Sequence, residues 1–245
     1  MPIDVPGDGT VLNTSVFEFP ASRSALAFQL GHVDDLPGVP ALPETLLAME
    51  FQLQEFSIDL CAISEIVLGD LGATIQILRL AGRENGDAEG RPVRIEDCIS
   101  DLGLRACLRA AAGGTMARGI RQRAVLQMWE HSRQIAQTCR LIAEEIPGFI
   151  SPHQAYLAGL LHGIGDLPAV LGWERSATQN YRPFTAVELA ERWSFPMFLK
   201  EFFHTVNKPG WSSQWSKMMS TAHRFASETS ACCVLASAPA AQILK

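Results

Sequence analysis

Histidine supplies the side chains of this sequence that could do chemistry. Four of the six histidines have informative surroundings. These are His131 in W-E-H-S, His162 in L-L-H-G-I-G-D, His204 after two phenylalanines, and His223 in A-H-R-F. Neutral imidazole is a common ligand of transition metals, and three imidazoles can hold zinc with the fourth position open. A single histidine is more often structural or exposed, so a site requires that folding bring several together.

Other catalytic signatures are missing from the sequence. It contains no G-x-x-x-x-G-K-[ST] phosphate loop, no G-x-G-x-x-G fingerprint and no G-x-S-x-G nucleophile elbow. The six cysteines form no C-x-x-C pair and stand in apolar, helix-like stretches. We therefore expect reduced thiols in the core, and the histidines remain the one candidate site.

Aromatic residues are concentrated after residue 192, and they suggest a second kind of function. Most stand at helical spacing and should be core, because aromatic side chains bury large areas. Trp211 and Trp215 follow Lys208-Pro209-Gly210, which is typical of a loop. Tryptophan is a favoured anchor at protein interfaces, so these two are candidate partner contacts beside the core interpretation.

Composition and charge narrow the classes of partner. A formal net charge of -6 disfavours binding to nucleic acid or to an anionic membrane, because phosphate binding needs concentrated Lys and Arg. We see no secretory signal in the first residues and no apolar run approaching the roughly 18 residues of a membrane span. The expected location is the cytoplasm, with no nucleic-acid or membrane partner.

Helical periodicity runs through most of the chain, with no convincing strand alternation and no fixed internal repeat. Helices are expected over about 44–54, over a segment that Ser57 would cap at its N-terminus, and over 71–81, 95–117 with a pause at Gly103, 124–146, 185–193, 196–206 and 213–231. Ser151-Pro152 predicts another helix start, because Ser caps a helix and Pro fits its first turn. The predicted fold class is all-α, in two packed helical lobes.

The same composition and periodicity predict the domain boundaries. Residues 1–36 mix Gly, Pro and Ser without a sustained period, so they are expected to form an irregular N-terminal arm. Residues 37–122 are assigned to an N-terminal helical lobe, and residues 123–245 to a C-terminal helical lobe that holds the candidate histidines.

An ordered set of segments resembles the HDOD family, the HD-related output domains of bacterial signalling proteins. The set comprises L-P near 36, P-E near 43, a helix pair divided by Gly69-Asp70, L-G-L at 102–104, W-x-H-S, L-L-H-x-I-G and the late Trp-Pro-His stretch. It covers about residues 36 to 230. The resemblance implies an HD-like multi-helix bundle with the HD motif in its second lobe.

Catalytic members of the wider HD superfamily are metal-dependent phosphohydrolases with a His, a His-Asp pair and a distant Asp. Carried over by the resemblance, the first two histidines fall on His131 and His162, the paired Asp falls on Gly163, and the late Asp falls on His223. Both carboxylates are then lost. Asp166 would restore one oxygen only if the helix continued past Gly165, where a break is favoured.

The resemblance thus implies a pseudoenzyme: a regulatory module that acts through an unidentified signalling protein, with no cofactor and no metal. The vestigial pocket would comprise His131, His162, Gly163, Asp166, His204 and His223. One alternative is a degenerate metal-dependent phosphohydrolase, and another is a domain that senses a nucleotide in the same cleft. The sequence leaves the partner, the pathway and the oligomeric state open.

Overall fold

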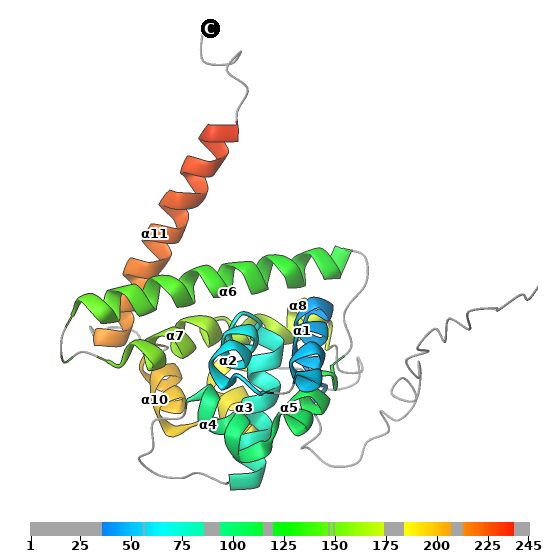
Figure 1. Ribbon diagram of the computed structural model, residues 1–245. Coiled ribbons are helices and arrows are strands. Elements are labelled where there is room, and N and C mark those ends of the chain that lie inside the picture. Colours follow the sequence, from blue (N-terminus) through cyan, green and yellow to red (C-terminus); the bar gives the residue numbers. More distant parts are fainter. Residues whose placement is uncertain are drawn as a thin grey trace, which may run out of the picture. The chain divides into compact units, whose positions relative to one another are not determined.

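The computed structural model is all-helical over the residues it describes, which is the predicted fold class (Figure 1). Those residues are 36–55, 57–85, 94–114, 120–146, 148, 150–173, 184–206 and 213–237, with the side chains of 85, 120 and 228–237 left aside. Residues 36–245 group as one compact unit. The predicted arm over 1–36 lies almost wholly outside the described residues, and the division into lobes at residue 122 stays a prediction.

Among the described residues, five helices precede the long central helix. They are α1 (Pro43–Gln54), α2 (Leu60–Leu68), α3 (Leu71–Asn85), α4 (Ile95–Leu102) and α5 (Leu104–Ala111). The remaining elements are α6 (Ile120–Glu145), α7 (Pro152–Leu161), the 3-10 turn η1 (Ile164–Asp166), α8 (Leu167–Leu171), α9 (Ala186–Arg192), α10 (Met197–Val206) and α11 (Gln214–Ser237). The expected helices therefore form, with ends that shift by a few residues.

Helix starts show how local sequence sets these elements. Ser151 caps α7 by accepting a hydrogen bond from the Gln154 N–H, with Pro152 at the first helical position, as predicted. The cap of α2 differs from the prediction: Asp59, rather than Ser57, accepts from two free backbone N–H groups. A carboxylate has two acceptor oxygens and a charge suited to a helix N-terminus, so it is the stronger cap of the two.

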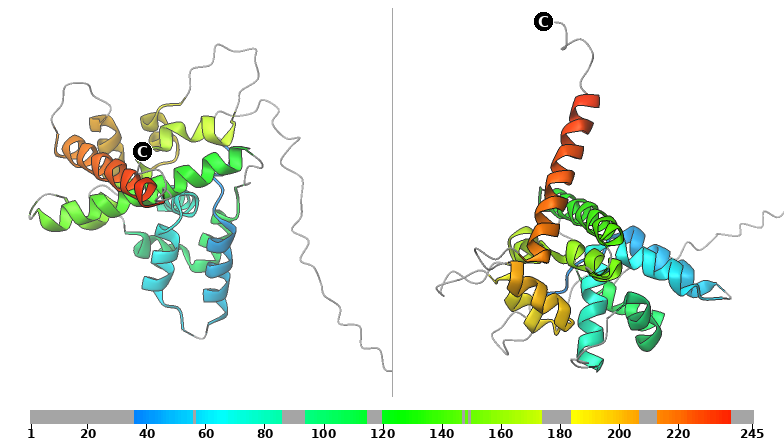
Figure 2. Two further views of the ribbon diagram at one scale, coloured as in Figure 1. Left: turned by 90° about the horizontal axis from the view of Figure 1, so that it is seen from above. Right: turned by 90° about the vertical axis from the view of Figure 1, so that its left-hand side faces the viewer.

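Helix α6 is the organising element of the second half of the chain. In Figure 1 it runs the length of the bundle, with α7 beneath it, and α11 crosses it; the left view of Figure 2 shows the same crossing. Gly159 lets α6 and α7 approach closely, because a Cβ at this position would lie 2.8 Å from the Ala136 Cα. This close approach holds the end of α7 against the middle of α6.

Asp70 joins three elements at the start of α3. One of its carboxylate oxygens accepts from the Gly72 N–H at 2.8 Å and from the Trp129 indole N–H at 2.9 Å, and the other accepts from the Leu42 N–H at 2.6 Å. Asp70 is fully buried. The carboxylate therefore caps α3 and fastens both the start of α1 and the middle of α6 to it.

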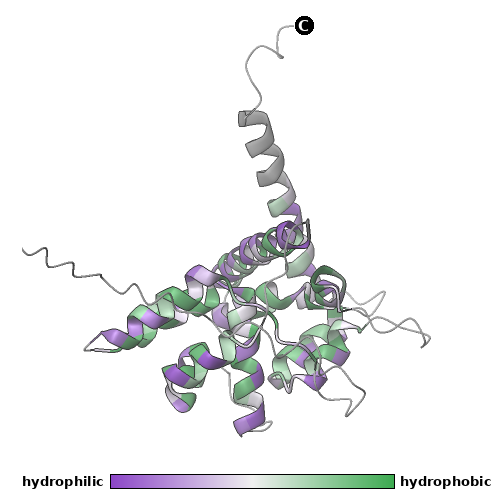
Figure 3. Cartoon of the chain, turned by 90° about the vertical axis from the view of Figure 1, so that its right-hand side faces the viewer, coloured by the Kyte–Doolittle hydropathy of each residue, from purple (hydrophilic) through white to green (hydrophobic). Residues whose placement is uncertain are grey.

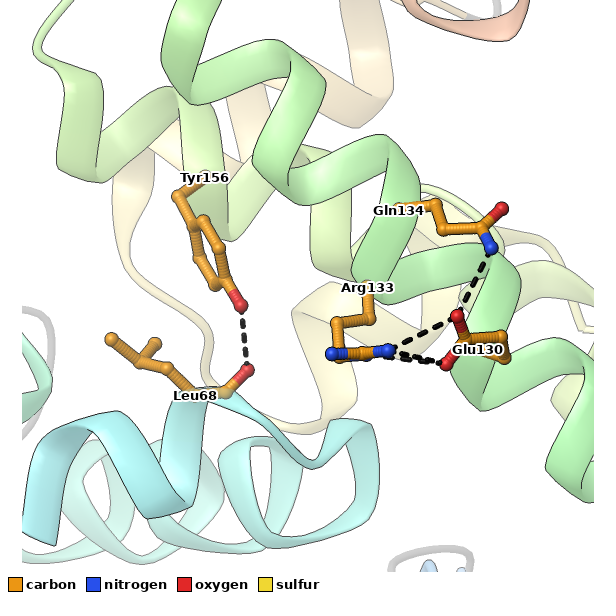
Figure 4. Close-up of polar contacts among 5 residues, drawn as sticks. All are labelled: Leu68, Glu130, Arg133, Gln134 and Tyr156. Carbon is orange, nitrogen blue, oxygen red and sulfur yellow. Dashed lines mark hydrogen bonds and ion pairs between the residues drawn. The ribbon is translucent and has the colours of Figure 1, made fainter. Parts of the chain in front are cut away.

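A second polar contact joins α7 to the end of α2. The Tyr156 hydroxyl donates to the Leu68 carbonyl at 3.0 Å (Figure 4). A separate group of polar contacts lies along α6, where the Glu130 carboxylate accepts from Arg133 at 2.8 Å and from Gln134 at 3.0 Å (Figure 4). The Glu130 carboxylate is thus engaged along its own helix, next to His131.

The core consists of the apolar faces of these helices. Figure 3 shows purple and green alternating along most of the helices it colours, as expected of amphipathic helices that bury one side. The residues of α3 from Leu71 to Leu78 are all buried. Within the described helices none is long and apolar enough to cross a bilayer alone, although α2 and α3 together pass that test as a pair bent by 115°.

Candidate functional site

Three of the predicted histidines meet where three helices come together. His131 lies on α6, His162 stands directly after the last residue of α7, and His223 lies on α11. The crossing of α11 over α6 brings together residues that are far apart in the sequence. We call His131, His162 and His223 the histidine cluster.

The three imidazoles are in mutual contact. Their ring centroids are 5.2 Å apart for His131 and His162, 5.4 Å for His131 and His223, and 4.9 Å for His162 and His223. One nitrogen from each ring can be chosen so that all three nitrogens lie within 4.8 Å of one another. Among the described His, Cys, Asp and Glu residues, this is the one group of three or more with metal-ligand geometry.

A backbone carbonyl fixes the orientation of the His162 ring. The Nδ1 atom lies 2.7 Å from the Gly159 carbonyl oxygen, which can only accept, so Nδ1–H donates and the lone pair of the neutral ring is on Nε2. Burial lowers the pKa of His162 to about 4; the Gly159 hydrogen bond opposes this, and the neighbouring His223 and His131 add to it. Burial and His131 also lower the pKa of His223. The lowered pKa values of His162 and His223 favour their neutral forms, in which an imidazole can bind a metal.

Gly163 stands beside the cluster and leaves room for a side chain. Its φ of -91° is ordinary for any residue. A Cβ there would make only an ordinary contact, 3.5 Å from the Met128 Cε. Met128 precedes His131 by one helical turn on α6, so such a Cβ points toward the helix face that carries His131. The backbone therefore does not require glycine at this position, and it would accept the aspartate that the resemblance places there.

The two other residues of the predicted pocket lie outside the histidine cluster. Asp166 is exposed at the end of η1 and is not among the residues whose ligand atoms meet there. Asp166 was expected to supply an oxygen ligand only if the α-helix continued that far. The α-helix ends at Leu161, so this condition is not met. His204 lies on α10, where its Nε2 is 3.9 Å from the exposed Glu191 carboxylate.

Of the two tryptophans that are candidate partner contacts, the structure describes one. Trp215 lies in α11, within the helix expected over 213–231, and it is partly buried, with its ring centroid 5.1 Å from that of Phe202. Trp211 lies outside the described residues. A role for either in partner contacts stays a prediction.

Sequence reasoning missed one residue that the geometry makes important. Gly159 supplies both the close approach of α7 to α6 and the carbonyl that sets the His162 tautomer. The available signal was its position three residues before His162, near the end of a helix, where carbonyls lack partners within the helix. Hydrogen bonding of the second ring nitrogen to a carbonyl is usual for metal-binding histidines.

Comparison with known proteins agrees with the helical architecture. The family model described as HDOD domain matches residues 39–183. A search of curated proteins finds no match. Two solved structures, each described as the MmoQ response regulator from Methylococcus capsulatus str. Bath, match with a TM-score of 0.57. The first is 20% identical to this chain, and the match covers 77% of this chain and 84% of the regulator's chain. The second is 19% identical, and the match covers 76% of this chain and 86% of the regulator's chain.

Proposed function

The chain belongs to the HDOD domain family, and from that premise we propose that it is a non-catalytic signalling module that acts through contacts with a protein partner. The similar structures are described as a response regulator, which favours a signalling role. The partner and the oligomeric state are left for experiment to identify.

One observation carries the non-catalytic part of the proposal: the histidine cluster contains three imidazoles and no carboxylate. Phosphoester hydrolysis by two metal ions needs oxygen ligands that bridge the ions and hold them about 3.5 to 4 Å apart. Mg²⁺ and Mn²⁺ also prefer oxygen ligands to imidazole. The nearby carboxylates do not offer this, because Glu130 is engaged with Arg133 and Asp166 is exposed outside the cluster.

The test of this proposal is a hydrolysis assay. Purified protein should be incubated with phosphomonoesters, linear and cyclic nucleotides and cyclic dinucleotides, in separate reactions with Mg²⁺, Mn²⁺, Fe²⁺ and Zn²⁺. We expect no release of phosphate or nucleotide above that of a His162→Ala variant prepared in parallel. Turnover that disappears in His162→Ala would show that the protein is an enzyme.

Partner contacts require a separate experiment with matched surface variants. Leu47 and Phe51 are exposed apolar residues one turn apart on α1, at 52% and 57% exposure, and Leu141 on α6 is 56% exposed. Cross-linking in a native lysate should compare the wild-type chain with Leu47→Ser/Phe51→Ser and Leu141→Ser. A signalling contact predicts a stoichiometric partner, reduced in at least one folded variant. Recovery of no protein above a denatured control would contradict it.

A further inference from the structure

The histidine cluster has a geometry that goes beyond a vestigial motif. We propose that His131, His162 and His223 bind one Zn²⁺ ion, which fastens α11 to the junction of α6 and α7. The zinc proposal does not depend on whether the protein is an enzyme, because a structural ion and a catalytic ion would use the same three ligands.

The distances support a single ion. Zinc binds histidine nitrogen at about 2.0 to 2.1 Å, so three tetrahedral ligands would be about 3.3 to 3.4 Å apart. The candidate nitrogens already lie within 4.8 Å of one another. The largest separation must therefore close by roughly 1.5 Å, a movement that small side-chain rotations about staggered rotamers can supply.

Three features of the surroundings suit zinc in particular. The Gly159 carbonyl holds Nδ1–H of His162 and leaves Nε2 available as the ligand atom. The ligand set is all nitrogen, which suits Zn²⁺ and related late transition metals and does not suit Mg²⁺ or Ca²⁺. His131 is exposed, so water can reach the fourth coordination position.

The origin of the ligands predicts what the ion would do. Each histidine comes from a different part of the fold: the middle of α6, the end of α7, and the face of α11 that crosses α6. An ion held by all three links α11 to the other two helices. Because a ligand that binds only the folded state stabilises it, zinc should raise the unfolding temperature.

Zinc binding is measured on the full chain without an affinity tag, after dialysis against a chelator and then against buffer. Isothermal titration calorimetry with ZnCl₂ should give about one ion per chain. Each of His131→Ala, His162→Ala and His223→Ala should weaken binding at least tenfold. His204→Ala and Cys61→Ser are the controls, since these two residues are exposed and lie outside the cluster. Both controls should bind zinc as the wild type does.

A thermal shift provides the second readout. Zinc at about 100 times its dissociation constant should raise the unfolding temperature of the wild type by about 5 to 10 °C. The same addition should raise the unfolding temperature of His223→Ala by at most about half as much, because a tenfold weaker site is only about ten times over its dissociation constant. Far-ultraviolet circular dichroism verifies that this variant is folded. Absence of stoichiometric binding in the wild type, or zinc binding of wild-type affinity in His223→Ala, would overturn the proposal.

The zinc-binding experiment and the hydrolysis assay can succeed or fail independently of each other. Zinc binding without turnover supports both proposals. Zinc binding with turnover keeps the ion and overturns the non-catalytic function. Absence of both zinc binding and turnover overturns the ion and leaves the signalling proposal in place.

Discussion

At the scale of single residues, Gly163 is the position at which the family resemblance places the aspartate of a metal-dependent phosphohydrolase. Glycine there meets no backbone requirement, since its φ is -91° and a Cβ would have ordinary space beside Met128. The neighbouring His162 keeps an orientation suited to metal binding through its hydrogen bond to Gly159. The imidazoles are thus arranged as ligands, while the adjacent position contributes no oxygen.

Restoring that oxygen gives a direct prediction. Gly163→Asp should fold with a change in unfolding free energy within about 1 kcal/mol, because the added side chain makes ordinary contacts. The new carboxylate should raise the affinity for Mn²⁺ at least tenfold, since Mn²⁺ favours oxygen ligands. Titration calorimetry measures the affinity. The Gly163→Asn variant adds a side chain of nearly the same size and shape as aspartate but without its charge. It therefore separates the effect of the carboxylate charge from the effect of the added volume. Equal Mn²⁺ affinity in the two variants would show that this position does not face the cluster.

At the scale of helices, the site depends on how closely α7 approaches α6. A Cβ at Gly159 would lie 2.8 Å from the Ala136 Cα and 3.1 Å from the Cys139 sulfur. Backbone atoms cannot give way as a flexible side chain can, so these helices would have to separate. The position of His162 at the end of α7 follows from this contact.

We predict that Gly159→Ala lowers the free energy of unfolding by about 1 to 2 kcal/mol. Overpacking costs about 1 to 3 kcal/mol, and the better helix propensity of alanine offsets up to about 1 kcal/mol of it. Urea denaturation measures the change. Gly163→Ala is the matched control, four positions away with ordinary space for its Cβ, and should change stability by less than about 0.5 kcal/mol. Equal stability of the two variants would contradict the proposed close contact.

Helix boundaries and caps were largely predictable from sequence, because each depends on residues near in the chain. Ser151-Pro152 identified the start of α7 correctly. The sequence predicted Ser57 as the cap of α2 in place of Asp59, since two candidates only two residues apart cannot be separated without the geometry of the first turn. The helix expected over 213–231 places Trp215 correctly in α11, which begins at Gln214.

At the scale of the whole molecule, long-range contacts were not predictable from the residues alone. Gly69-Asp70 was recognised only as a break between helices, yet Asp70 binds Leu42 and Trp129 from distant segments. The pairing of His131 with His162 came from family resemblance. No local pattern separates His204, which lies beside Glu191, from His223, which joins the cluster.

Asp70 accordingly provides a prediction about the stability of the entire bundle. Burial raises the pKa of this carboxyl, and hydrogen bonds from Leu42, Ala73, Thr45 and Trp129 act against that rise. Asp70→Ala would leave several buried N–H groups without their acceptor, each costing about 1 to 3 kcal/mol. We expect the free energy of unfolding to fall by about 3 kcal/mol or more.

Chemical denaturation followed by tryptophan fluorescence measures this loss, because Trp129 donates directly to Asp70. Asp166→Ala is the matched control, since Asp166 is exposed, and it should change stability by less than about 0.5 kcal/mol. A loss below about 1 kcal/mol in Asp70→Ala would mean that water or another group replaces the carboxylate.

The measurement that most directly tests the central claim is X-ray absorption at the zinc edge of the loaded protein. The central claim is that the site presents imidazoles in place of the carboxylates that hold two catalytic metals. It predicts a single zinc ion with about three imidazole nitrogens near 2.0 Å and one oxygen from water. A second metal about 3.5 to 4 Å away, or carboxylate oxygens in the coordination shell, would contradict it.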